Sequence, residues 1–193
     1  MATSIPLTQI SMPGHRAPGA GFEAPFEMLD ACHERVERML KLLARLQQRL
    51  LVHGWDESVA QAARDVMRYF DQAAPQHHED EERHVFPPLL AQGDAVLVAM
   101  VQKLQADHRE MERSWLAVRE VLASLTEAPP AGWTGITPAQ AEVLGHFTGL
   151  YRHHLDDEDG LIYPAAQARL SAEALRAMSA DMMQRRGLEP PAS

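Results

Sequence analysis

Cysteine is almost absent from this chain: Cys32 is the only cysteine among 193 residues. A single thiol cannot form an intramolecular disulfide, and it cannot supply the several thiolates of a Cys-based zinc or iron–sulfur site. A reducing compartment suits this composition. Aromatic residues are also scarce, at 6%, whereas Leu, Ala, Met, Glu, Gln and Arg, which lose little on entering a helix, dominate. The composition therefore predicts an all-α protein.

Basic clusters and long apolar runs are missing as well. The chain has 18 basic and 27 acidic residues, a formal charge of −9, and no cluster of Lys and Arg that would bind phosphates. The same lack of positive charge argues against an anionic membrane surface. No apolar stretch approaches the ~20 residues that span a bilayer, and the N-terminal residues do not resemble a signal peptide. We therefore expect a cytoplasmic protein with no nucleic-acid or membrane partner.

Apolar residues recur at spacings of three, four and seven along most of the chain, which is the pattern of helices with one buried side. The pattern predicts long helices at about residues 25–53, 57–85, 94–124 and 138–164, and a short one at 171–186. Because the connections are short, we expect an antiparallel four-helix bundle at residues 25–165. Residues 1–24 should form an irregular N-terminal arm, and residues 166–193 a C-terminal helix, as an appendage, with a tail.

Glycine, aspartate and proline predict the helix boundaries. Gly54 should end the first long helix, and Asp56 should cap the second. Pro75 should kink the second helix or start a new segment, because proline lacks a backbone donor and crowds the preceding turn. Pro87 and Pro88 should mark its end.

Histidine followed four residues later by glutamate is the most frequent polar pattern. Residues four apart on a helix lie one turn apart on the same side, so an imidazole and a carboxylate at this spacing can reach one point. Ten histidines and 16 glutamates in 193 residues would give about one such pair by chance. The chain has six: His33–Glu37, His53–Glu57, His77–Glu81, His78–Glu82, His108–Glu112 and His154–Glu158.

A duplication selects among these pairs. Aligning the QHHEDEERHVFP segment with HHLDDEDGLIYP at an offset of 77 residues superimposes three positions of one on the other: His77 on His154, Glu81 on Glu158, and Phe86 on Tyr163. An AxHxxφER pattern, where φ is apolar, likewise occurs at 31–38 and 106–113, at an offset of 75. The duplication thus predicts two copies of a helix pair, with one His-x-x-x-Glu on each helix.

Two pairs fall outside this scheme. The His53 pair spans the predicted helix break at Gly54, and the position equivalent to His78 is Leu155, whereas the position equivalent to His77 is a histidine. The duplication therefore favours His77 over His78.

The four remaining pairs point to metal binding. A single surface pair of this kind is an ordinary i,i+4 contact, but four of them in duplicated segments, beside apolar stripes, predict ionisable groups in a core. Such groups cost several kcal/mol each unless they bind a metal or one another. Imidazole and carboxylate without thiolate suit iron or manganese, and zinc is also compatible. Four histidines with several carboxylates exceed what one six-coordinate ion needs, so two ions are expected.

Four features, taken in chain order, resemble the hemerythrin-like HHE cation-binding domains over about residues 25 to 165. They are a histidine on the first predicted helix, H-x-x-x-E-E-x-x-x-F-P on the second, a histidine on the third, and H-x-x-x-E with an aromatic-proline end on the fourth. The resemblance implies two iron ions with a bridging oxo or hydroxo group. It also implies His33, His77, His108 and His154 as terminal ligands, with Glu81 and Glu158 as bridges. The chain departs from the oxygen-carrying hemerythrins at Glu112, which stands in place of a second histidine, and at Glu158, which replaces a more distant aspartate.

Glu37 and Glu112 decide whether such a centre is open. Two octahedral irons offer twelve positions. Four histidines, two bridging carboxylates and a bridging oxygen leave two of these for an outside ligand, and binding by Glu37 and Glu112 would fill them. The alternative is that each glutamate pairs with a neighbouring arginine on a solvated face.

The expected function is a non-haem di-iron protein that binds, senses or detoxifies O2, NO or peroxide, or handles iron under oxidative or nitrosative stress. One alternative is a redox enzyme that turns over such a ligand with electrons from a donor protein. Another is a coordinatively closed storage or structural site. The sequence leaves the metal, the ligand and the oligomeric state open.

Overall fold

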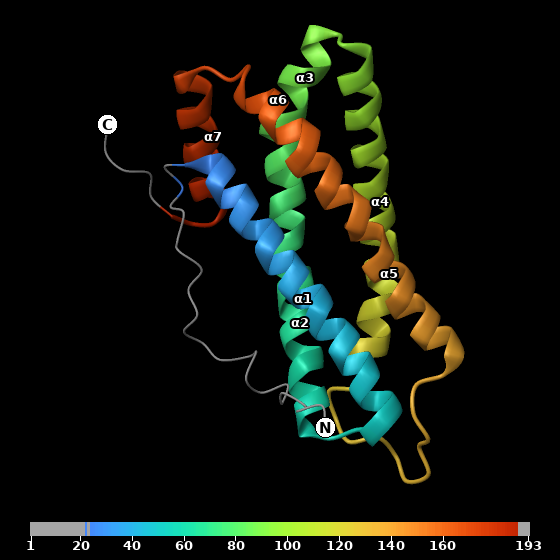
Figure 1. Cartoon of the computed structure of the whole chain (residues 1–193). Coiled ribbons are helices and arrows are strands. Elements are labelled where there is room, and N and C mark those ends of the chain that lie inside the picture. Colours follow the sequence, from blue (N-terminus) through green and yellow to red (C-terminus); the bar gives the residue numbers. More distant parts are fainter. Residues whose placement is uncertain (1–21, 23, 189–193) are drawn as a thin grey trace, which may run out of the picture. The chain divides into compact units, whose positions relative to one another are not determined.

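The computed structural model describes residue 22 and residues 24–188, and all regular structure in this range is helical. Most of the predicted N-terminal arm, residues 1–21 and 23, lies outside the described residues. Within the described range, no helix combines the length and the apolar content needed to cross a membrane. The predicted all-α class is confirmed. In chain order (Figure 1), the elements are α1 (Pro25–His53), α2 (Glu57–Asp80), η2 (Glu81–Val85), α3 (Phe86–Gln92), α4 (Ala95–Ala123), α5 (Pro138–Asp157), η3 (Glu158–Ile162), α6 (Tyr163–Gln167) and α7 (Ala172–Arg185).

The connection between α1 and α2 follows the sequence prediction. Gly54 adopts a positive φ of 75°, which favours glycine and ends α1. Asp56 caps α2, because its Oδ1 accepts the backbone N–H groups of Ser58 and Val59 at 3.0 and 3.1 Å. Both predicted boundary signals are confirmed.

The prolines do not begin or end helical segments at the expected places. Pro75 lies inside α2, which continues to Asp80 without a break. One missing N–H removes only one hydrogen bond, and burial of the flanking Ala74 and His77 holds this segment in place. Pro87 and Pro88 do not end the helical path either. They lie in the first turn of α3, where a missing N–H costs nothing, and Gly93 ends that helix with a φ of 73°.

The described chain forms two compact units, and each long helix contributes to both. The aromatic unit comprises residues 36–74 and 109–152. The histidine unit comprises residues 24–35, 75–108 and 153–188, together with residue 22. The buried apolar side chains of the aromatic unit include Leu43, Val66, Leu122, Leu144 and Phe147.

The histidine unit has an apolar cluster that closes one side of its polar interior. The short helices α3 and α6 lie side by side (Figure 1) and bury Phe86 and Tyr163. Met178 and Met182 of α7 are buried in the same cluster. Arg186, just after α7, pairs with the fully buried Asp80 at 2.7 Å. The C-terminal helix is therefore an integral part of this unit, which corrects the prediction of an appendage.

Candidate metal centre

Two wide helical turns carry the carboxylates of the centre. Glu81 and Glu158 are the first residues of the π-helical segments η2 and η3. The backbone N–H of Phe86 donates to the carbonyl of Glu81, and Tyr163 does the same to Glu158, across five residues instead of four. A proline follows directly in both copies, and its ring crowds the carbonyl four residues earlier, which favours a wider turn. Such π-turns frequently occur at functional sites.

The first candidate metal position consists of His33, His77, Glu81 and Glu158, which we call position A. One possible ligand atom from each of these residues lies within 4.8 Å of all the others, and all four residues are buried. His33 comes from α1, His77 from the last turn of α2, and the two glutamates from η2 and η3. Three separate stretches of sequence therefore converge on position A.

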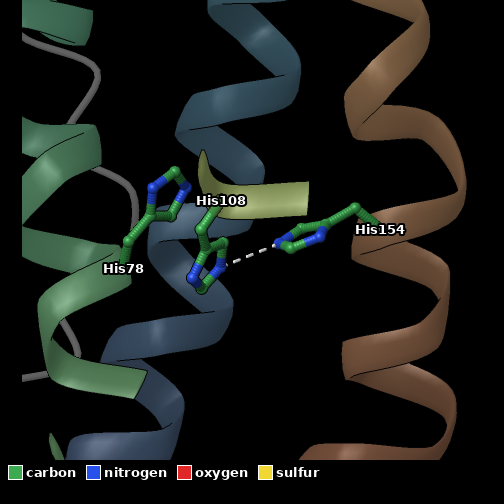
Figure 2. Close-up of side chains that lie close together, drawn as sticks. All are labelled: His78, His108 and His154. Carbon is green, nitrogen blue, oxygen red and sulfur yellow. Dashed lines mark hydrogen bonds between the residues drawn. The ribbon is translucent and has the colours of Figure 1, made fainter. Parts of the chain in front are cut away.

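The second candidate position consists of His78, His108 and His154, which we call position B. Their rings come from α2, α4 and α5 and lie close together (Figure 2). The Nε2 atoms of His108 and His154, joined by the dashed line in Figure 2, are separated by 3.2 Å. His78 stacks on His108 with ring centroids 4.1 Å apart. Position B is therefore rich in imidazole nitrogen.

Both carboxylates reach from one position to the other. Glu158 Oε2 lies 3.2 Å from His33 Nε2, and Glu158 Oε1 lies 3.0 Å from His154 Nε2. Glu81 Oε1 lies 3.5 Å from His77 Nε2, and Glu81 Oε2 lies 3.4 Å from His108 Nε2. Each glutamate thus directs one oxygen to each position, as a bridging carboxylate would.

Outer carboxylates orient three of the imidazoles. The Nδ1 atom of His33 lies 2.7 Å from Asp159, that of His108 lies 3.1 Å from Glu82, and that of His154 lies 3.5 Å from Asp107. An acceptor at Nδ1 fixes the ring so that Nε2 faces the centre, and it makes that nitrogen a better ligand.

The charges of the metal-free centre balance through protons. Burial lowers the pKa of His33, but the carboxylates of Asp159 and Glu158 outweigh burial and raise it to about 10. Burial and nearby carboxylates act in the same way on His108, whose pKa rises to about 11. Burial raises the pKa of Glu158, but His154, His108 and His33 hold it well below its usual value. Protonated imidazoles thus supply the positive charge that the two glutamates require.

His78 differs from these imidazoles. Burial and the positive fields of His108, His77 and His154 hold its pKa well below the ordinary value. His78 is therefore neutral in the metal-free protein, which is the form that binds a metal.

The residues present fit metal ions. Both oxygens of Glu158, one of Glu81 and both ring nitrogens of His77 are buried and accept or donate no hydrogen bond among the described residues. Buried polar atoms without a hydrogen bond are costly and rare. The donors are imidazole nitrogen and carboxylate oxygen, which suit divalent iron, manganese or zinc. Cations between the two carboxylates would satisfy every one of these oxygens.

Six of the eight predicted ligands meet in the centre: His33, His77, Glu81, His108, His154 and Glu158. Glu37 and Glu112 do not. Glu37 is exposed and pairs with Lys41 at 2.6 Å, and Glu112 is exposed on α4. Both lie in regular helix rather than at a π-turn, so neither is turned toward the interior. Glu37 and Glu112 therefore lie outside the group of side chains that could hold a metal.

Two residues of the centre escaped the sequence prediction. The duplication disfavours His78, because Leu155 occupies the equivalent position, yet His78 is buried in position B. The sequence indicates Tyr163 only as the equivalent of Phe86, yet its hydroxyl reaches the side chains of position A. A signal was available in each case, because a histidine or a tyrosine hydroxyl at a predicted core position requires a polar partner.

Comparison with known proteins agrees with this geometry. The family model described as "Hemerythrin HHE cation binding domain" matches residues 24–166, which include every residue of both positions. A Haemophilus influenzae protein that bears the name "Uncharacterized protein" is 29% identical over 167 residues, which cover 86% of this chain and 92% of that protein. The family match spans most of the chain. The chain therefore belongs to the hemerythrin HHE cation-binding domain family.

Proposed function

We propose that the protein is a non-haem di-iron protein that binds, senses or detoxifies a small ligand such as O2, NO or peroxide. The observation that carries this proposal is the pair of buried carboxylates, Glu81 and Glu158, that reach from position A to position B. A bridged pair of this kind holds two ions close together. Bound iron would supply reversible redox chemistry and vacant coordination positions for a small molecule.

A count of the ligand atoms indicates where a coordination position would stay open. Five imidazoles and two bridging carboxylates fill nine of the twelve positions around two octahedral ions. A bridging oxygen fills two more. Position B, with three histidines, is then complete, and one place is left at position A, next to His33 and His77. We infer that an outside ligand would bind there.

The protein residues around the centre have separable roles. The five histidines would hold the ions, and the two glutamates would bridge from one position to the other. Asp159, Glu82 and Asp107 keep the rings of His33, His108 and His154 in the orientation that binds metal. Full burial of both glutamates excludes bulk water, which strengthens every electrostatic contact inside.

The test is metal analysis of the aerobically purified protein together with its absorption spectrum. We expect about two irons per chain and the absorption of an oxo- or hydroxo-bridged ferric pair. His77→Ala should lose at least half of the metal, because it removes a donor from position A. His53→Ala is the matched control, since it alters an exposed His-x-x-x-Glu pair and should keep all the metal. Full metal retention by His77→Ala would contradict the proposal.

The same preparation separates the alternatives. Reversible spectral change on exposure to O2 or NO supports ligand binding. Turnover that depends on an added electron donor supports a redox enzyme with a donor protein as partner. A centre that shows neither a spectral change with O2 or NO nor donor-dependent turnover supports storage or a structural role. Manganese or zinc in place of iron would favour this last possibility. We expect the protein to act in the cytoplasm, because its one thiol, Cys32, is buried and cannot form an intramolecular disulfide.

A further inference from the structure

One oxygen atom distinguishes two equivalent positions of the duplication. Phe86 and Tyr163 begin α3 and α6, each five residues after a glutamate of the centre. Phe86 stacks on His108 with ring centroids 5.7 Å apart, and Tyr163 stacks on His33 with ring centroids 5.1 Å apart. The two aromatic rings therefore cover equivalent imidazoles, and only the second carries a hydroxyl.

The Tyr163 hydroxyl lies among the ligand atoms of position A. Tyr163 is 3% exposed. Its oxygen donates a hydrogen bond to Glu81 Oε1 at 2.5 Å and lies 3.0 Å from His33 Nε2. Adjacent donors of an octahedral ion with bonds of about 2.1 Å are about 3 Å apart. The hydroxyl is therefore spaced from His33 Nε2 as a further donor to the same ion would be, and it lies still closer to Glu81 Oε1.

We propose that Tyr163 is a metal ligand, whose phenolate oxygen occupies the last place at position A until an outside ligand displaces it. This inference rests on the proposed di-iron function and adds a regulation of that site. With Tyr163 included, position A has two imidazole nitrogens and three oxygens, and position B has three nitrogens and two oxygens. The oxygen-rich position A then suits the harder ferric ion.

The proton balance is simple. A ferric ion at position A replaces the phenol proton, which leaves to solvent, and no electron is transferred. The hydroxyl donates its hydrogen bond to Glu81, and cations bound between the carboxylates would offset the negative charge beside it, so the same arrangement accepts a phenolate once metal is present.

The test is visible spectroscopy of the full chain loaded with ferric iron. A tyrosine phenolate on iron(III) gives a visible charge-transfer band and resonance-enhanced ring vibrations. We expect both in the wild-type protein. Tyr163→Phe should lose them while keeping its iron, because the substitution removes one oxygen and leaves the ring on His33. Tyr151→Phe is the matched control, since it removes a buried hydroxyl from the aromatic unit and should keep the band.

Azide binding to the ferric protein gives a second readout. In Tyr163→Phe no phenolate competes for the last place at position A, so azide should bind about tenfold more tightly or better. Azide affinity in Tyr151→Phe should equal that of the wild type. Equal azide affinity in Tyr163→Phe and in the wild type would overturn the proposal that an outside ligand displaces the Tyr163 phenolate.

The remaining outcomes separate this inference from the proposed function. Wild-type protein with two irons and no phenolate band overturns the role of Tyr163 alone. A band that persists in Tyr163→Phe does the same, and the wild-type vibrational spectrum decides the matter even if that variant fails to fold. Wild-type protein that binds no iron overturns both the proposed function and this inference.

Discussion

The two compact units place opposite chemistry in their interiors, although the same four long helices run through both. In the aromatic unit, Phe70 lies with its ring centroid 5.1 Å from those of Trp115 and Phe147, and Tyr151 lies 5.3 Å from Phe147. Among the residues that the structure describes, every buried charged or imidazole side chain except Asp65 belongs to the histidine unit. Helix formation alone therefore does not determine what fills the interior.

The difference indicates a division of labour. Burial of aromatic and aliphatic side chains stabilises the aromatic unit without help from any ligand. In the histidine unit, buried imidazoles and carboxylates replace that apolar packing at the centre, and they are costly unless charges are balanced. We expect the aromatic unit to supply stability and the histidine unit to depend on what it binds. Four experiments test this contrast.

The largest effect should follow from a cavity in the aromatic unit. Phe147 is fully buried against Phe70, Trp115 and Tyr151. Phe147→Ala should lower the free energy of unfolding by about 3–5 kcal/mol, measured by urea denaturation. Leu116→Ala is the control, because Leu116 is 66% exposed and its loss should change little. The folded Phe147→Ala protein should keep its metal, and loss of metal would show that the two units are not separable.

Metal removal should act on the other unit. A metal at one hundred times its dissociation constant stabilises the folded state by about 2.7 kcal/mol, so chelation should lower the melting temperature. Hydrogen exchange should rise around Glu81 and Glu158, whose charges lose their partners, and change little around Phe70 and Leu144. Equal acceleration in both units would contradict the division of labour.

A pH series should show proton release on metal binding. The pKa values of His33 and His108 are raised to about 10 and 11, so their contribution to metal-free stability is complete below about pH 6.5 and is lost as pH rises toward those values. Metal must displace these protons. Its apparent affinity should therefore rise with pH, by up to tenfold per unit for each proton released, or about 1.4 kcal/mol. Titrations between pH 6.5 and 8.5 measure this slope, and a flat profile would contradict it.

The smallest effect should come from the helix cap in the aromatic unit. Asp56→Ala removes the acceptor for Ser58 and Val59 and should cost about 1 kcal/mol. Arg49 also holds the pKa of Asp56 below its usual value, so this contribution is present above about pH 4 and is lost as the pH falls. Asp56→Asn keeps an acceptor and should recover most of the loss. Neither variant should alter metal content, and a change in it would break the contrast.

Much of the fold was predictable from local sequence signals. The apolar spacing located the four long helices, and the stop at Gly54 and the cap at Asp56 are confirmed. These signals are local, since they depend on backbone freedom and on neighbouring N–H groups. The new segment expected at Pro75 does not form, since α2 continues through this residue to Asp80.

The centre was only partly predictable, for a geometric reason. Successive residues on an α-helix point about 100° apart, so His77 and His78 face positions A and B, respectively. Both residues satisfy the His-x-x-x-Glu spacing, and the duplication favours His77 alone. The spacing also treats Glu37 and Glu81 alike, although only Glu81 begins a π-turn. The proline six residues after Glu81, and again after Glu158, is a sequence feature that separates these glutamates from Glu37 and Glu112.

The sequence by itself determined the helices, the duplication and the type of donor atoms, because periodicity and composition act through neighbours along the chain. Tertiary structure alone decided which side chains meet. It turned Glu81 and Glu158 inward at two wide turns, placed His78 in the three-histidine position, and brought the Tyr163 hydroxyl to His33. Contacts between residues more than a hundred positions apart in the sequence depend on how the helices pack. No local sequence pattern encodes which of these residues meet.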